Sequence, residues 1–187
     1  MAGPSVTIAL RSGAMSGLLE LDGIHAQDVG TILAAVLQTS RRPATEILQR
    51  LSGATLHIQV LASGERPLTD REQYRLQAGA LHQCRYRHGR LVTQDGLVAA
   101  STSLVWLPAR LRHDTCRELD EGTEPAGIIL GRLGMRREDR RAMPTGFDDE
   151  ITGEPRATAS SAVLVVDGQR VAIAEEFVTM AFAETLA

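Results

Sequence analysis

A β-hairpin near the C-terminus is the feature that most constrains the fold of this 187-residue chain. Two apolar runs within residues 161–178 flank the dipeptide Asp167-Gly168. Asp-Gly between alternating hydrophobic residues is a strong hairpin signal, because glycine accepts the positive φ that a tight hairpin turn needs. The sequence therefore predicts two antiparallel strands that are joined at these two residues.

The second strand of this hairpin carries two adjacent glutamates. Side chains in a strand alternate between the two faces, so Glu175 shares a face with the bulky residues Ile173 and Phe177, whereas Glu176 shares its face with Arg170 and small residues. We therefore expect Glu175 to face the interior and Glu176 to need no partner. A carboxylate on an apolar face is costly unless it is paired or protonated, which makes Glu175 a candidate functional residue.

Helices are predicted mainly in the first part of the chain. Apolar residues recur at helical spacing over residues 26–37, and a shorter amphipathic helix follows and ends at Gly53. Thr69 and Glu72 have the spacing of a capping box, which predicts the start of a further short helix. Another helix is predicted at residues 111–121.

Strands alternate with these helices and then dominate the C-terminal part. Apolar and β-branched runs predict strands at residues 54–61, 81–93 and 97–107, and a short run at residues 6–10 is compatible with another. A second Asp-Gly turn, Asp95-Gly96, joins two of them. Residues 63–67 are predicted as a loop. Residues 135–160, which begin with a cluster of charges, are predicted as a solvated face or mobile loop. The pattern predicts one α+β domain over residues 1–187, with a mainly antiparallel sheet and helices packed on one side.

Composition excludes several classes of function. The net charge of −3 gives no general attraction to nucleic acid or to an anionic membrane, and no run of about 18 apolar residues is present. We therefore expect a cytoplasmic protein without nucleic-acid or membrane partners. Cys84 and Cys116 are isolated, which predicts free thiols instead of a disulfide or metal site. We expect a monomer or homodimer with no metal and no cofactor.

The remaining candidate chemistry combines one inward carboxylate with arginines on an earlier strand. Motifs typical of nucleotide binding, serine hydrolysis and zinc proteolysis are absent from usable positions of the sequence. Glu175 and the arginines near Arg87, in a shared cavity, would suit a small organic anion, because a guanidinium can hold a carboxylate by two parallel hydrogen bonds. The alternatives are that Arg87 forms a salt bridge with Glu175 across the sheet, or that Arg87 is solvated.

Four segments, taken in order, resemble the chorismate lyase family, whose members make 4-hydroxybenzoate and share their fold with the UTRA-type effector-binding domains of a class of bacterial transcription regulators. The resemblance spans about residues 39–178. The segments are TSRRPATEILQRLSG (39–53), RYRHGRLVTQDG followed by LVWLP (85–108), EPAGIILG (124–131) and VVDGQRVAIAEEFV (165–178).

The resemblance implies a cofactor-independent lyase that eliminates pyruvate from chorismate to give 4-hydroxybenzoate or a related aromatic acid. It assigns Glu175 as the catalytic acid/base and Arg87 as the anchor of the substrate carboxylate, with Arg85 or Arg90 as fallback anchors. Four further residues are implied at the substrate: Ala126 and Gly127 in a Pro-x-Gly turn, Ala44 beneath a helical flap, and Phe177.

Two other functions remain open. The family has Glu and then apolar residues after the anchoring arginine, whereas His88, Gly89 and Arg90 follow Arg87 here. This departure fits the same fold acting on another cyclic carboxylic acid in specialised metabolism. The shared fold also fits a non-catalytic, UTRA-like protein that binds a small aromatic acid.

Overall fold

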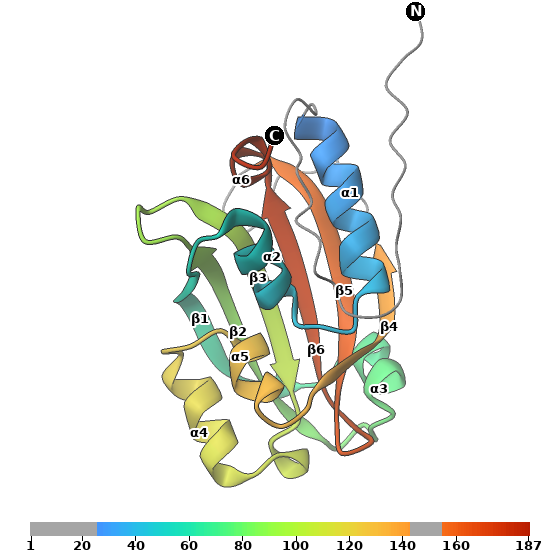
Figure 1. Ribbon diagram of the computed structural model, residues 1–187. Coiled ribbons are helices and arrows are strands. Elements are labelled where there is room, and N and C mark those ends of the chain that lie inside the picture. The colour runs from blue at the N-terminus through green and yellow to red at the C-terminus, as the bar shows by residue number, and fades with distance from the viewer. Residues whose placement is uncertain (1–25, 143–154) are drawn as a thin grey trace, which may run out of the picture.

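The predicted C-terminal hairpin forms the middle of the structure. The computed structural model describes residues 26–142 and 155–187, and their sheet has six antiparallel strands in the order β1-β2-β3-β6-β5-β4 (Figure 1). Asp167 and Gly168 join β5 to β6 with φ values of 49° and 77°, which confirms the predicted hairpin turn. The strands are β1 (His57–Pro67), β2 (Gln83–Val92), β3 (Val98–Trp106), β4 (Arg136–Ala142), β5 (Arg156–Val166) and β6 (Gln169–Thr179).

The helices start and end largely where local signals predict. Gly53 and Gly122 adopt left-handed conformations at the C-caps of α2 and α4, and the Thr69–Glu72 capping box begins α3. The helical elements are α1 (Ala26–Thr39), α2 (Ala44–Ser52), α3 (Asp70–Leu76), the 3-10 turn η1 (Pro108–Arg110), α4 (His113–Glu121), α5 (Ala126–Gly131) and α6 (Met180–Glu184).

Helices cover the front face of the sheet in two groups (Figure 1). Helices α1, α2 and α6 pack over one end, and α4 and α5 pack over the other. These contacts confirm the predicted α+β class, with an antiparallel sheet and helices on one side. On the rear face, the short helix α3 contributes Leu76 to a smaller apolar cluster.

The central strands are buried on both faces. In β5, Ala162 and Leu164 belong to the front cluster, whereas Val163 and Val165 belong to the rear cluster. A strand of this kind reads as a continuous apolar run, because each face meets a protein layer instead of water. Alternation along such a strand separates two faces but does not mark one of them as the exterior.

Two predicted loops are strands in the structure. Residues 63–67 extend β1, and the charge cluster forms β4 at the edge of the sheet. Charged side chains suit an edge strand, because one edge of its backbone has no strand partner. The possible strand at residues 6–10, and residues 143–154 of the predicted loop, lie outside the described residues. Among the helices that are described, none is long and apolar enough to cross a membrane.

Candidate ligand-binding site

A cavity of about 40 Å³ lies where the two groups of helices meet over the sheet. Its polar walls come from strands β2, β4 and β6, and its cover comes from the first residues of α2 and α5. The residues that line it include Ala44, Arg87, Ala126, Gly127, Arg137, Glu175 and Glu176. Five of the predicted site residues, Arg87, Glu175, Ala44, Ala126 and Gly127, therefore border one cavity.

Arg87 is a buried cation in this cavity, with only 3% of its surface exposed. Its guanidinium donates to two neutral carbonyl oxygens, Leu119 O at 2.9 Å and Glu124 O at 3.4 Å. The nearby carboxylate of Asp120 is instead paired with Arg85. Burial lowers the pKa of the Arg87 guanidinium, and the charge of Asp120 offsets this effect only in part.

Both alternatives to an anion-binding role for Arg87 are therefore wrong. Its low exposure excludes a solvated side chain, and the ion pairs of the described residues include none between Arg87 and Glu175. A buried charge is costly when its hydrogen-bond partners are neutral and the nearby carboxylate, Asp120, is paired with another arginine, so Arg87 is the residue of this site that best suits an anionic partner.

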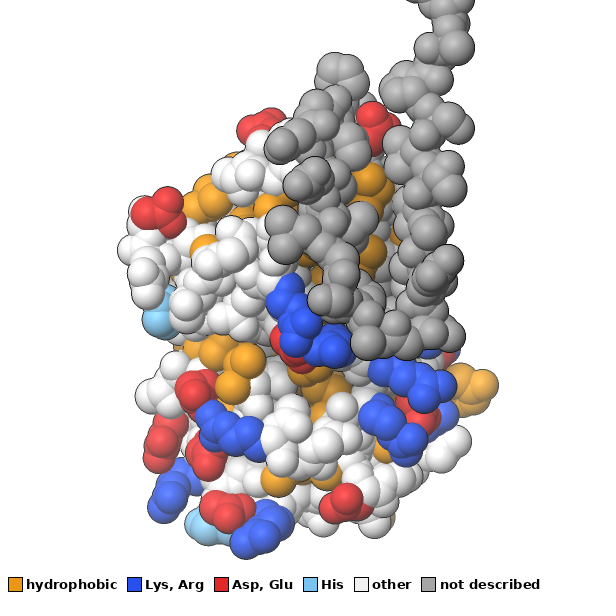
Figure 2. All heavy atoms as spheres, in the orientation of Figure 1, with side chains coloured by type: hydrophobic (Ala, Val, Ile, Leu, Met, Phe, Trp, Pro, Cys, Tyr) orange, Lys and Arg blue, Asp and Glu red, His pale blue; other side chains and the backbone are white. Residues whose placement is uncertain are grey.

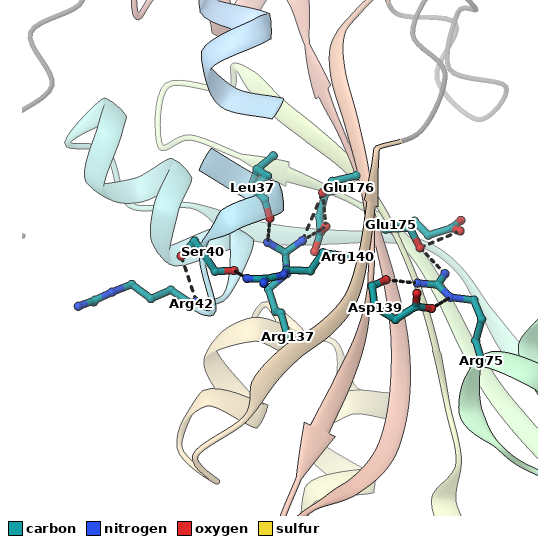
Figure 3. Close-up of polar contacts among 11 residues, drawn as sticks. Leu37, Ser40, Arg42, Arg75, Arg137, Asp139, Arg140, Glu175 and Glu176 are labelled. Carbon is teal, nitrogen blue, oxygen red and sulfur yellow. Dashed lines mark hydrogen bonds and ion pairs between the residues drawn. The ribbon is translucent and has the colours of Figure 1, made fainter. Parts of the chain in front are cut away.

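Glu176 supplies the carboxyl group of the cavity, and the expectation that it needs no partner is wrong. It is 8% exposed, and its Oε2 accepts hydrogen bonds from Arg137 Nη2 at 3.1 Å and from Ser160 Oγ at 3.0 Å (Figure 3). Helices cover the face of β6 that the small residues share, so this face is buried although its side chains are small. Burial raises the pKa of the Glu176 carboxyl, although Arg137 and Ser160 act in the opposite direction.

Arg137 is the site residue that the sequence analysis missed. Its side chain is 1% exposed and reaches Leu37 O at 3.0 Å in addition to Ser160 and Glu176. Its Nε is buried and has no hydrogen-bond acceptor among the described residues. The available signal was the alternation within β4, which turns one arginine of the charge cluster inward once that cluster is recognised as a strand.

Glu175 directs its carboxylate to the rear of the sheet, although it also borders the cavity (Figure 3). It is half-buried and accepts a long hydrogen bond of 3.4 Å from Ser161. Ser161 in turn accepts from Arg75, a buried residue of α3 that also bonds Asp139. The catalytic role assigned to Glu175 stays a prediction, but its side chain does not face Arg87.

The remaining predicted site residues lie apart from the cavity. Arg90 is three residues beyond Arg87, so alternation in β2 places its side chain on the opposite face. Phe177 stacks beneath the guanidinium of Arg156, whose central carbon is 4.1 Å from the ring centroid. Arg85 borders α4 through Asp120. The structure thus favours Arg87 over both fallback anchors.

The cover of the cavity is tightly packed at Gly127. A Cβ atom at this position would lie 2.8 Å from Pro43 Cβ and 3.4 Å from Thr45 Oγ1, so α5 approaches α2 more closely than a larger residue permits. The first backbone bonds of α5 are donated by Ile128 and Ile129 to Pro125 O. The amide groups of Ala126 and Gly127 precede them at the cavity wall.

Taken together, the charged groups of the cavity favour an oxyanion. Two guanidinium groups, Arg87 and Arg137, and the carboxyls of Glu175 and Glu176 border the cavity. Because Glu175 directs its carboxylate to the rear of the sheet, the front side of the cavity has two guanidinium groups and one carboxyl. Guanidinium groups bind carboxylates through short charge-assisted hydrogen bonds. Within residues 26–142 and 155–187, no group of three or more His, Cys, Asp or Glu residues could hold a metal ion.

Comparison with known proteins gives structural relatives only. No family model and no curated protein sequence matches the chain. Among solved structures, it is similar to PhnF from Mycobacterium smegmatis, with a TM-score of 0.56 and 12% identity over 72% of this chain and 62% of that one. It is similar to the possible transcriptional regulator YydK from Bacillus subtilis subsp. subtilis str. 168, with a TM-score of 0.52 and 13% identity over 72% of this chain and 61% of that one.

The effector domain of PhnF alone gives a better match in length. The TM-score is 0.55 at 12% identity, and the match covers 73% of this chain and 85% of that domain. The chain thus corresponds to less than two thirds of each of the two longer chains but to most of the isolated effector domain. These likenesses show that the chain has the fold of the PhnF effector domain, in line with the effector-binding fold that the predicted resemblance implies.

Proposed function

We propose that this chain is a small-molecule binding domain that takes an organic acid into the front cavity, with Arg87 and Arg137 holding the carboxylate. The observation that carries the proposal is the buried guanidinium of Arg87, whose hydrogen-bond partners within the described residues are neutral carbonyl oxygens. A bound carboxylate would supply the missing countercharge. It would also offer an acceptor to the buried Nε of Arg137.

The structural likeness supports a binding role. One similar structure is an effector domain, and it aligns with most of the chain. The shared fold does not identify the ligand, because folds host many functions and the site must be argued from its own residues. The ligand class proposed here therefore rests on the two arginines and Glu176.

Calorimetry with a matched pair of ligands tests the proposal. We expect 4-hydroxybenzoate to bind and its neutral amide analogue to bind far more weakly. Arg87→Met should reduce affinity for the acid by roughly 10- to 100-fold, as expected for loss of a charge-assisted hydrogen bond. Arg90→Met is the control, because Arg90 lies on the same strand and faces away from the cavity. Equal binding of the acid and the amide, or a larger loss in Arg90→Met, would contradict the proposal.

A second candidate function is the elimination of pyruvate from chorismate, as the lyase resemblance implies. The specific observation in its favour is Glu176, a carboxyl with a raised pKa in the same cavity as Arg87. A carboxyl whose pKa is raised holds its proton to a higher pH than an ordinary glutamate, so it can deliver a proton to a leaving group while an arginine orients the substrate. Aromatisation of the ring would drive the reaction without a cofactor.

Turnover separates this enzyme from a binding domain. The protein is incubated with chorismate, and pyruvate and 4-hydroxybenzoate are measured, together with the variants Glu175→Gln and Glu176→Gln. Loss of activity only in Glu176→Gln would assign the acid to the residue in the cavity, and loss only in Glu175→Gln would support the residue selected by the resemblance. If pyruvate forms no faster than in buffer, lyase activity on chorismate is excluded. A screen of other cyclic carboxylic acids then tests the remaining alternative.

A further inference from the structure

A second, larger hollow opens directly outside the front cavity. Its volume is about 460 Å³, and it is bordered by the start of α2, by α5 and by the beginning of β4. Pro43, Gly127 and Met135 line both the hollow and the inner cavity. The two spaces are therefore adjacent and meet at these three residues.

The inner cavity, at about 40 Å³, is far smaller than the outer hollow. It takes the carboxylate end of a ligand beside Arg87 and leaves little space for a long apolar body. If the carboxylate lies beside Arg87, a longer ligand would extend toward the residues that border both spaces. The outer hollow is the space that is available for it.

The residues that line the hollow indicate the chemical character of the part of the ligand that lies outside the inner cavity. Its wall includes the side chains of Ile128, Pro43 and Met135 and the glycine backbone of α5, and these groups offer apolar contact. Figure 2 shows a hollow lined by hydrophobic side chains on the front face, with basic side chains gathered beside it. The residues that line the hollow include the exposed Arg41 and Arg136, whose positive charge favours the approach of an anion.

We propose that the ligand is an elongated amphipathic carboxylic acid, whose carboxylate enters the inner cavity and whose apolar body lies in the outer hollow along Ile128 and Met135. This inference rests on the proposed function, because it takes the carboxylate at Arg87 as given. It adds a ligand class and a specificity-determining surface. A short acid that fills only the inner cavity should bind weakly, and affinity should grow with the length of the apolar body.

A homologous series of linear carboxylic acids tests the inference by calorimetry on the whole chain. From acetate to octanoate, we expect the affinity to rise by roughly two- to fourfold for each added methylene, as for partial to full burial of a methylene group. Ile128→Gln should flatten this dependence on length while leaving the affinity for acetate nearly unchanged. Leu81→Gln is the matched control, because Leu81 is a 96% exposed apolar residue that does not border the hollow.

A second variant covers the case in which Ile128→Gln fails to fold. Gly131 is exposed in α5, and a Cβ there would meet Pro43 Cγ at 3.7 Å, an ordinary contact distance. Gly131→Asp therefore adds a negative charge at the hollow without a clash, and it should weaken octanoate binding by at least several-fold more than acetate binding.

The outcomes distinguish this inference from the proposed function. If affinity is independent of chain length, or if both hollow variants leave the length dependence intact, the elongated ligand is contradicted. The proposed function survives that result as long as Arg87→Met still weakens binding of the acids by roughly 10- to 100-fold. If Arg87→Met has no effect on any acid, the proposed function itself fails.

Discussion

The two faces of the sheet carry clusters of the same residue types, but the clusters differ in what they leave unsatisfied. On the front face, Arg137 bonds Glu176 and Ser160, and its Nε has no acceptor within the described part of the chain. On the rear face, Arg75 uses Nε and Nη2 on Asp139 and uses Nη1 on Ser161 (Figure 3).

The two clusters differ in whether all their hydrogen-bond donors have acceptors, and this difference distinguishes a structural cluster from a binding site. The guanidinium of Arg75 bonds through all three of its nitrogens, which suits a group that fixes α3 to the sheet. The front cluster lies beside a second buried cation, Arg87, and Arg137, which lines the cavity, retains a buried Nε donor without an acceptor among the described residues. The comparison therefore identifies the front as the place for a ligand, although both clusters contain buried arginines.

The largest loss of stability should follow removal of the carboxylate of the front cluster. Glu176→Ala leaves Arg137 buried without its partner, so we expect the free energy of unfolding to fall by about 3–5 kcal/mol. Urea denaturation followed by circular dichroism measures this change. The double variant Arg137→Met/Glu176→Met removes both charges and should recover most of the loss. An equally unstable double variant would mean that the ion pair is not the cause.

Removal of the rear arginine should cost less than removal of the front glutamate. Arg75→Met leaves the carboxylate of Asp139 with Arg141, 2.9 Å away, and with partial exposure to water. We expect a loss of about 1–3 kcal/mol from the broken hydrogen bonds, measured by the same denaturation. A loss above that of Glu176→Ala would reverse the proposed ranking of the two clusters.

The two faces should also respond to pH in opposite directions. The pKa of Glu176 is raised above its ordinary value of 4.5, so its contribution to stability is present below that value and is lost as pH rises through the folded-state pKa. For Asp139, burial raises the pKa, but hydrogen bonds from Arg141 and Arg75 outweigh burial and lower it below 3.8. Its contribution is present above pH 3.8 and is lost as pH falls through the folded-state pKa.

Denaturation at several pH values measures how the free energy of unfolding changes with pH. Each single group can contribute at most about 1.4 kcal/mol per pH unit. Relative to the wild type, Glu176→Gln should remove a loss of stability above pH 4.5, and Asp139→Asn should remove a loss at acidic pH. Parallel pH profiles of the two variants would show that the clusters do not differ in this way.

The smallest expected effect on stability comes from Glu175. Its carboxylate is half-buried and holds only a long hydrogen bond from Ser161, so Glu175→Gln should change the free energy of unfolding by less than about 1 kcal/mol. Thermal denaturation next to the Glu176→Gln variant checks this. If Glu175→Gln loses more free energy of unfolding than Glu176→Gln, Glu175 is the buried carboxylate, as the alternation pattern predicts.

Local patterns predicted those parts of the fold that depend on neighbours in sequence. The hairpin at Asp167-Gly168, the C-cap at Gly53 and the Thr69 capping box are set by a few adjacent residues, and all three are present. Arg87, Ala44 and the Pro-x-Gly turn also come together at the cavity as expected.

The missed parts depend on contacts between distant segments. Whether Glu176 is inside or outside depends on which helices cover β6, and alternation along one strand cannot show this. Arg137 was missed for a related reason: the charges around it resemble those of a solvated loop, and its inward direction follows from the pairing of β4 with β5. Alternation along a strand defines two faces, and the packing of the other elements determines whether each face contacts protein or water.

A crystal structure of the protein grown with 4-hydroxybenzoate or hexanoate is the most direct test of the central claim. We expect the carboxylate on the front face, within hydrogen-bond distance of Arg87 and of the Nε of Arg137, with the body of the ligand extending past Gly127. An acid bound on the rear face beside Glu175 and Arg75, with the front cavity unchanged, would contradict the account.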